Sequence, residues 1–113
     1  MRKRTHKNPA VAAEVVRILA LLGENIQTAR IRRGWRQIDL ASRAGITRLQ
    51  LIQVEKGKLT TAVGAYAAAL WALGLEDGLR SIADPASDAE GITLEAARAN
   101  RRARPNAILS DDF

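Results

Sequence analysis

The sequence has 113 residues and contains no cysteine, a single histidine and few aromatic residues. Without cysteine the chain cannot form a disulfide or bind a metal through thiolates. His6 has no second candidate ligand near it, so neither a metal site nor a histidine-based catalytic centre is expected. Aromatic residues make up only 4% of the chain while hydrophobic residues make up 47%, so small aliphatic side chains must fill the core.

Long hydrophobic runs are also missing, and none approaches the roughly 18 residues that a membrane-spanning helix needs. Residues 1–23 combine a basic start with an apolar stretch, as a secretory leader does, but Glu14 and Arg17 interrupt it. No small-residue cleavage pattern follows, so we expect a cytoplasmic protein, with secretion as the alternative. Paired carboxylates, a nucleophile with its base and a glycine-rich phosphate loop are absent in the necessary context, so no enzymatic activity and no cofactor are expected.

Charge is distributed unevenly along the chain. Residues 1–58 hold 13 Lys and Arg against 4 Asp and Glu, and residues 59–113 hold 5 against 8. The net charge of +6 is therefore a balance between a basic first half and a slightly acidic second half. A basic half of this kind favours a polyanion as partner, and a solvated basic surface is the alternative.

Apolar residues recur at helical spacing, and no alternating strand pattern occurs, which predicts an all-α fold. Glycines and capping residues divide the chain into five expected helices after a basic, flexible arm over residues 1–9. The helices are expected at residues 10–33, with Gly23 as a possible break or kink, and at 36–44, 47–55, 62–73 and 76–83. Thr47 and Thr61 would begin the third and fourth helices. Residues 10–83 then form the folded domain, and residues 84–113 form a C-terminal tail that is either partner-binding or disordered.

Two sets of apolar residues outside the central motif have expected positions. Trp35 and Trp71 are expected in the core, because helix junctions need large apolar side chains to fill them. A stripe on the first helix either packs on the same core or helps dimerisation, and the sequence leaves both open; it consists of Val11, Val15, Ile18 and Leu22.

Residues 37–58 (QIDLASRAGITRLQLIQVEKGK) carry the requirements of two short helices joined by a tight turn. Ala41 is small enough for a second helix to cross the first, and Gly45 tolerates the positive φ of the turn. Leu51 and Val54 lie three residues apart, on one inward face of the second helix. The inner side is completed by Leu40, Ala44 and Ile46. Together, at this fixed spacing, these residues predict a helix-turn-helix.

The opposite face of the second of these helices carries Arg48, Gln50 and Gln53. Arginine can bond bidentately to guanine and glutamine to adenine, so this face is a candidate for reading DNA bases. Leu49 can contact a thymine methyl group, and Ile52 packs against the fourth helix or a partner. A merely solvated polar face is the alternative interpretation of these residues.

The motif resembles the Cro and phage-repressor (XRE) helix-turn-helix family, over about residues 20–83. The resembling residues are Ile26, Arg30-Ile31, Trp35-Arg36-Gln37, Leu40-Ala41, Gly45-Ile46-Thr47, Leu51, Val54-Glu55-Lys56-Gly57-Lys58, Ala69-Leu70 and Leu73-Gly74. This resemblance implies a five-helix repressor-like domain that binds double-stranded DNA as a homodimer, with its third helix in the major groove.

The resemblance also implies roles for individual residues. Arg30 and Glu55 match a buried ion pair that locks the first helix to the third and is structural. Gln37 is expected to contact the DNA backbone, and Thr47 to act as helix cap, phosphate contact or both. Base reading falls to Arg48, Leu49, Gln50 and Gln53. Further cations are expected beside the DNA backbone, namely Arg36, Arg43, Lys56 and Lys58, with Arg32 and Arg33 extending the basic surface.

Residues 65–91, followed by an arginine-rich stretch, are similar to HipB-type antitoxins, which are encoded beside HipA-like kinase toxins. With no sensor domain in the chain, regulatory input would come from a partner, and the tail over residues 92–113 carries scattered apolar anchors for one. The resemblance implies a repressor of its own operon, acting as the antitoxin of a type II toxin-antitoxin pair on a palindromic operator. The alternatives are a stand-alone phage-type repressor and a protein-interaction module that does not bind DNA.

Overall fold

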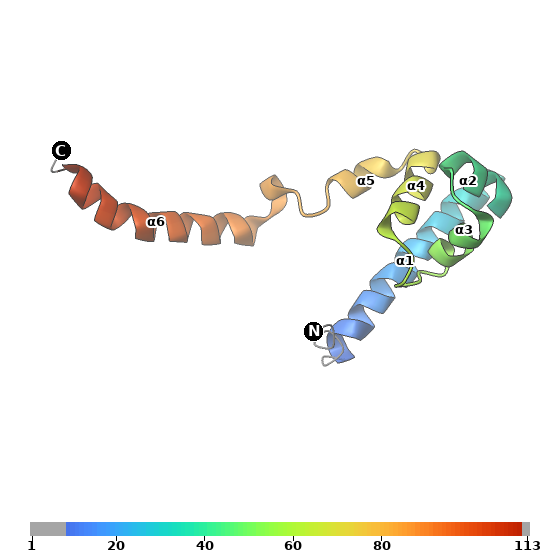
Figure 1. Cartoon of the computed structure of the whole chain (residues 1–113), viewed down its shortest axis with the longest axis horizontal. Coiled ribbons are helices and arrows are strands. Elements are labelled where there is room, and N and C mark those ends of the chain that lie inside the picture. Colours follow the sequence, from blue (N-terminus) through green and yellow to red (C-terminus); the bar gives the residue numbers. More distant parts are fainter. Residues whose placement is uncertain (1–8, 112–113) are drawn as a thin grey trace. The chain divides into compact units, whose positions relative to one another are not determined.

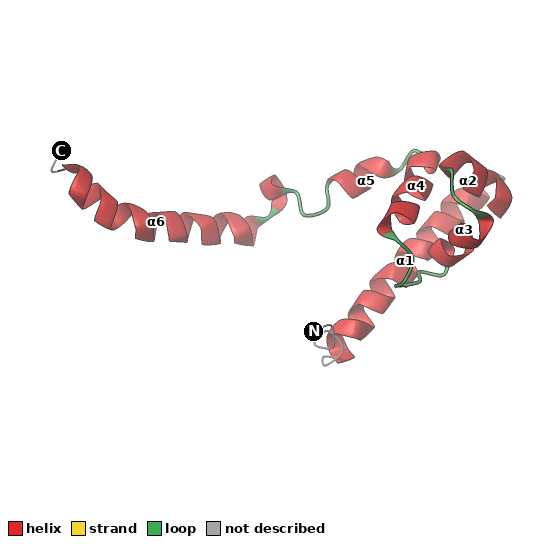
Figure 2. Cartoon of the chain, in the orientation of Figure 1, coloured by secondary structure: helices red, strands yellow, loops and turns green. Residues whose placement is uncertain are grey.

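The computed structural model describes the backbone of residues 9–111 and the side chains of residues 12–103. Apart from Pro9, the expected basic arm lies outside the described residues. Within them every regular element is helical and no strand is present, which confirms the all-α prediction (Figures 1 and 2). The elements in chain order are α1 (Pro9–Arg32), α2 (Gln37–Ala44), α3 (Arg48–Glu55), α4 (Val63–Leu73), α5 (Glu76–Arg80), the 3-10 turn η2 (Pro85–Ser87) and α6 (Ala89–Asp111).

The chain divides into two compact units, residues 1–79 and residues 80–113. The first unit therefore ends four residues before the boundary expected after Ala83. Helix α5 stops at Arg80 instead of continuing to Ala83, which itself has a positive φ of 59° that an α-helix does not accommodate. Asp84 precedes Pro85, which also disfavours helical backbone there.

The core of the first unit lies between the second half of α1 and helices α2, α3 and α4. Ile26, Leu40, Leu51 and Val54 are its largest fully buried side chains. The other buried residues of the core are four alanines, a tyrosine and a leucine, namely Ala29, Ala41, Ala65, Ala69, Tyr66 and Leu73. Alanines dominate this shell, as expected for a sequence poor in aromatic residues, and they let the short helices approach one another closely.

Helix α1 continues through Gly23, so the break considered there is absent. Gly23 is instead the point where α1 meets the end of α3. A Cβ atom at Gly23 would lie 2.5 Å from the carbonyl oxygen of Glu55, and one at Gly57 would lie 2.5 Å from that of Leu19. Gly57 also has a φ of +69°, which favours glycine. The two glycines allow α1 and the end of α3 to pack backbone against backbone.

Two expectations about individual side chains are wrong. Thr61 does not cap α4, because Ala62 is the N-cap residue and no side chain caps this helix. The Thr61 hydroxyl instead donates to Oε1 of Gln53 at 3.4 Å. Trp71 is 62% exposed, since it is two residues, or about 200° of helix, beyond the buried Ala69. Trp35, by contrast, is half-buried and packs against the core as expected.

Only part of the apolar stripe on α1 packs on the core. Leu22 packs against the core, whereas Val15 and Ile18 remain exposed in this chain. Val11 lies outside the described side chains. Residues 12–18 are exposed on all sides of the helix, so this part of α1 contributes nothing to the core.

Candidate nucleic-acid interface

Helix α3 has one face inside the first unit and one face in solvent. Leu51, Val54 and Glu55 are buried, while Arg48 and Leu49 at the start of the helix are exposed. Leu49 has 64% of its surface exposed, and burying so large an apolar side chain against a partner is favourable. The first turn of α3 therefore offers a cation and an aliphatic group side by side.

A reciprocal capping box starts α3. The backbone N–H of Gln50 donates to Oγ1 of Thr47 at 3.0 Å, and the backbone N–H of Thr47 donates to Oε1 of Gln50 at 2.9 Å. The Thr-x-x-Gln spacing in the sequence is the signal that would have predicted it. Bidentate reading of adenine needs both the carbonyl oxygen and the NH2 group of glutamine. Gln50 can therefore serve in that way only when the box opens.

Gln53 lies in a less open position than the sequence predicted. It is half-buried and accepts the hydrogen bond from Thr61, which lies in the loop between α3 and α4. Ile52 is half-buried as well. The freely exposed part of α3 is thus its first turn.

A buried network orients α3 relative to α1 and α2. The guanidinium of Arg30 on α1 donates two hydrogen bonds to the carboxylate of Glu55, at 2.6 and 3.1 Å. The same guanidinium donates to the carbonyl oxygen of Trp35 at 2.9 Å, before α2 begins. Both charged residues are only 8% exposed. Arg30 and Glu55 thus form the ion pair that the resemblance implied, in the bidentate geometry that arginine favours.

Gln37 belongs to this network as well as to the outer surface. Its amide Nε2 donates to Oε1 of Glu55 at 3.2 Å, and the residue is half-buried at the first position of α2. A glutamine that contacts a DNA phosphate from this position would also be hydrogen-bonded to the buried Glu55. Gln37 therefore has a structural role in addition to the predicted contact with the DNA backbone.

The expected cations around α2 and α3 differ in how free they are. Lys56 and Lys58 are exposed beside the end of α3. Arg43 stacks on Trp35, with its guanidinium carbon 4.1 Å from the ring centroid, which holds the charge in place. Arg33 serves a structural purpose, because it donates to the carbonyl oxygens of Ala29 at 2.8 Å and Leu73 at 3.0 Å. Arg33 thus ties the end of α1 to the end of α4.

Arg36 precedes α2 and is held by Asp39, a residue that the sequence reasoning did not single out. The Asp39 carboxylate accepts from the backbone N–H of Arg36 at 2.8 Å and from its guanidinium at 3.2 Å. These hydrogen bonds from Arg36 lower the pKa of Asp39 below its ordinary value and raise that of Arg36. Both groups face water, so the pair fixes the start of α2 more than it stabilises the fold.

Other kinds of site find no support in the described residues. No group of three or more His, Asp and Glu side chains gathers there in the way that a metal ion would need. No helix in that part of the chain has the length and apolar character to cross a membrane. In comparisons with known proteins, no family model matches the chain, and no curated protein and no solved structure gives a match.

Proposed function

We propose that this protein is a sequence-specific, DNA-binding transcriptional repressor that acts as a homodimer. The observation that carries the proposal is the division of α3 into two faces. Its inner face is fixed to α1 by the buried Arg30–Glu55 pair, and its first turn presents Arg48 and Leu49 to solvent. A rigid helix with an open, basic first turn is what insertion into a major groove requires.

In the proposed complex, α3 lies in the major groove of double-stranded DNA. Arg48 bonds to a guanine and Leu49 contacts a thymine methyl, while Gln50 reads an adenine once its capping box has opened. Lys56 and Lys58 lie beside the phosphate backbone and add affinity that depends on salt rather than on sequence. A dimer would place two such helices on palindromic half-sites about 34 Å apart, and occupation of a promoter would block transcription.

As the finer function, we propose that the repressor is the antitoxin of a toxin-antitoxin pair and represses its own operon. Residues 80–113 support this, because they form a unit separate from the one that holds α3. A kinase-like toxin could bind this second unit without occupying the DNA-reading face. A kinase-like reading frame next to this gene, with a product that forms a complex with the chain, would be the expected finding. An adjacent integrase or lysis gene would favour the stand-alone repressor instead.

DNA binding is tested by two substitutions in the first turn of α3, using duplexes selected from a random pool with the unmodified chain. Arg48→Ala should weaken binding to the selected duplex by about 10- to 100-fold, which is what one bidentate base contact contributes. Gln50→Glu should also weaken it, because it places a negative charge against DNA while keeping the oxygen that the capping box needs. Circular dichroism should be unchanged for both.

Arg101→Ala on α6 is the matched control, since it removes the same charge from an exposed position outside the first unit. It should leave affinity for the selected duplex unchanged. Affinity should also fall steeply as salt rises. Unchanged binding by both α3 variants would overturn the assignment of that face. Failure to bind any duplex, even at low salt, would favour a protein-interaction module.

A further inference from the structure

Helix α6 has 23 residues and belongs to the second unit, where it packs on the neighbouring turn η2. Every residue from Ile92 to Ala103 is exposed. Ile92 and Leu94 are 50% and 56% exposed. Isolated helices gain little stability from hydrogen bonding alone in water, and most helical stability in proteins comes from packing one face. Helix α6 therefore has an unpartnered face.

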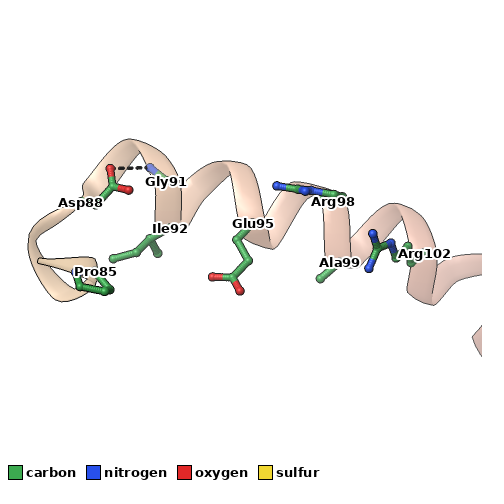
Figure 3. Close-up of a pocket in the computed structure, with 8 residues that line it drawn as sticks. All are labelled: Pro85, Asp88, Gly91, Ile92, Glu95, Arg98, Ala99 and Arg102. Carbon is green, nitrogen blue, oxygen red and sulfur yellow. Dashed lines mark hydrogen bonds between the residues drawn. The ribbon is translucent and has the colours of Figure 1, made fainter. Parts of the chain in front are cut away.

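One side of α6 is suited to another helix. Its apolar residues follow the four-three-four spacing of a coiled-coil seam and comprise Ile92, Ala96, Ala99 and Ala103. Figure 3 shows part of this side, where Ile92, Glu95 and Ala99 lie along the same shallow hollow as Arg102. Glu95 and Arg102 are seven residues apart, so they lie on the same edge of the seam, at positions where charges select a partner.

Charge along α6 indicates which partner fits. Asp88 precedes the helix and Glu90 and Glu95 lie in its first two turns, with no cation among them. The following described residues reverse this, with Arg98, Arg101 and Arg102 and no carboxylate. A second α6 in parallel would place like charges together, whereas an antiparallel one would place the acidic part of each helix against the basic part of the other. The helix is thus complementary to a reversed copy of itself.

We propose that α6 pairs with α6 of a second copy of this chain as an antiparallel, two-fold-symmetric helix pair. With the axis between Ala97 and Arg98, Ala96 faces Ala99 of the second copy, and Ile92 faces Ala103. Glu95 then lies beside Arg102 of the second copy, and the symmetry makes this ion pair twice. The alanines allow the two helices to approach closely, and Leu94 and Arg101 remain on the outer side.

This inference rests on the homodimer of the proposed function and assigns part of its interface. Association is measured without DNA, so a failure here leaves DNA reading by α3 to its own test. Analytical ultracentrifugation of the full chain at low ionic strength should show a dimer. Glu95→Arg and Arg102→Glu should each weaken dimerisation by roughly 10-fold, because two exposed ion pairs turn from attraction to repulsion.

The double variant, Glu95→Arg with Arg102→Glu, should restore dimerisation, since it exchanges the two charges and keeps their complementarity. Arg101→Glu makes the same charge change on the outer side and should leave the dimer intact. A monomeric unmodified chain would overturn the proposal. So would a dimer that ignores both single variants, that weakens equally with Arg101→Glu, or that the double variant fails to restore. Weakened DNA binding of Arg102→Glu without weakened association would indicate that the basic part of α6 binds nucleic acid instead.

Discussion

Helices α1 and α6 have nearly the same length, 24 and 23 residues, but the structure uses them differently. The second half of α1 buries Gly23, Ile26, Ala29 and Arg30 against other elements. Residues 92–103 of α6 are exposed, as are residues 12–18 of α1. Length and helix-forming residues therefore say little about what stabilises a helix here. Helix α1 differs from α6 because the small Gly23 and the buried charge of Arg30 let α1 pack against α3.

Removing the buried carboxylate of Glu55, which pairs with Arg30 of α1, should have the largest effect on the free energy of unfolding. Glu55→Ala leaves Arg30 buried without its carboxylate and should lower the free energy of unfolding by about 3–5 kcal/mol. The measurement is urea denaturation followed by circular dichroism. Glu24→Ala, which removes an exposed carboxylate from α1, should cost no more than about 0.5 kcal/mol. Similar values for the two variants would show that the buried pair does not hold α1 to α3.

A smaller loss is expected where the backbones of α1 and α3 touch. Gly23→Ala would place a Cβ atom 2.5 Å from the Glu55 carbonyl oxygen, so the two helices must separate, at a cost of about 1–3 kcal/mol. Gly64→Ala in α4 is the control, because it meets no atom within 4 Å and should instead stabilise by about 0.4–1 kcal/mol. Thermal unfolding of both variants should thus give shifts of opposite sign, and shifts of the same sign would contradict the close crossing.

The smallest effect should be confined to α6. Asp88 accepts the backbone N–H of Gly91 at 2.9 Å and caps the start of the helix. Asp88→Ala should destabilise α6 locally by about 1 kcal/mol, whereas Asp88→Asn keeps a capping oxygen and should not. Hydrogen exchange should therefore accelerate for α6 amides in the alanine variant and stay unchanged for residues 26–32. Acceleration in both regions would mean that the helices unfold together.

The helix pair was predictable from sequence because its constraints are local. Ala41, Gly45, Leu51 and Val54 lie within 14 residues, and each does the task that its size or backbone freedom indicates. The ion pair between Arg30 and Glu55 spans 25 residues and was accessible only through the resemblance. Spacing alone does not say which of many arginines finds a carboxylate.

Contacts between distant segments account for what the sequence could not predict. Gly23 looked like a possible kink, because a glycine that admits another backbone and one that breaks a helix are identical in sequence. Thr61 was expected to cap α4, but its hydroxyl bonds to Gln53 across the loop. The exposure of Trp71 depends on which side of α4 packs against α1 and α2. The prediction of a buried Trp71 rested on its large apolar side chain alone and was wrong.

Only those features of the candidate site that depend on local helix geometry were predictable from the sequence. The exposure of Leu49 follows from its helical distance from Leu51, and that of Arg48 from its place as the first residue of α3. The half-burial of Gln53 does not, since it depends on the path of the loop after Lys58. Gln50 was assigned to base reading although Thr47 three residues earlier also indicated a cap.

The capping box at the start of α3 sets different rules of substitution for neighbouring positions. Arg48 and Leu49 can be exchanged for other side chains without touching the hydrogen bonds that begin the helix. Gln50 has less freedom, because only glutamate shares its ability to complete the box, and glutamate repels DNA. Under the proposed function, a lineage that shifts to a new operator would therefore diversify first at Arg48 and Leu49. Gln50 would change late, or together with Thr47.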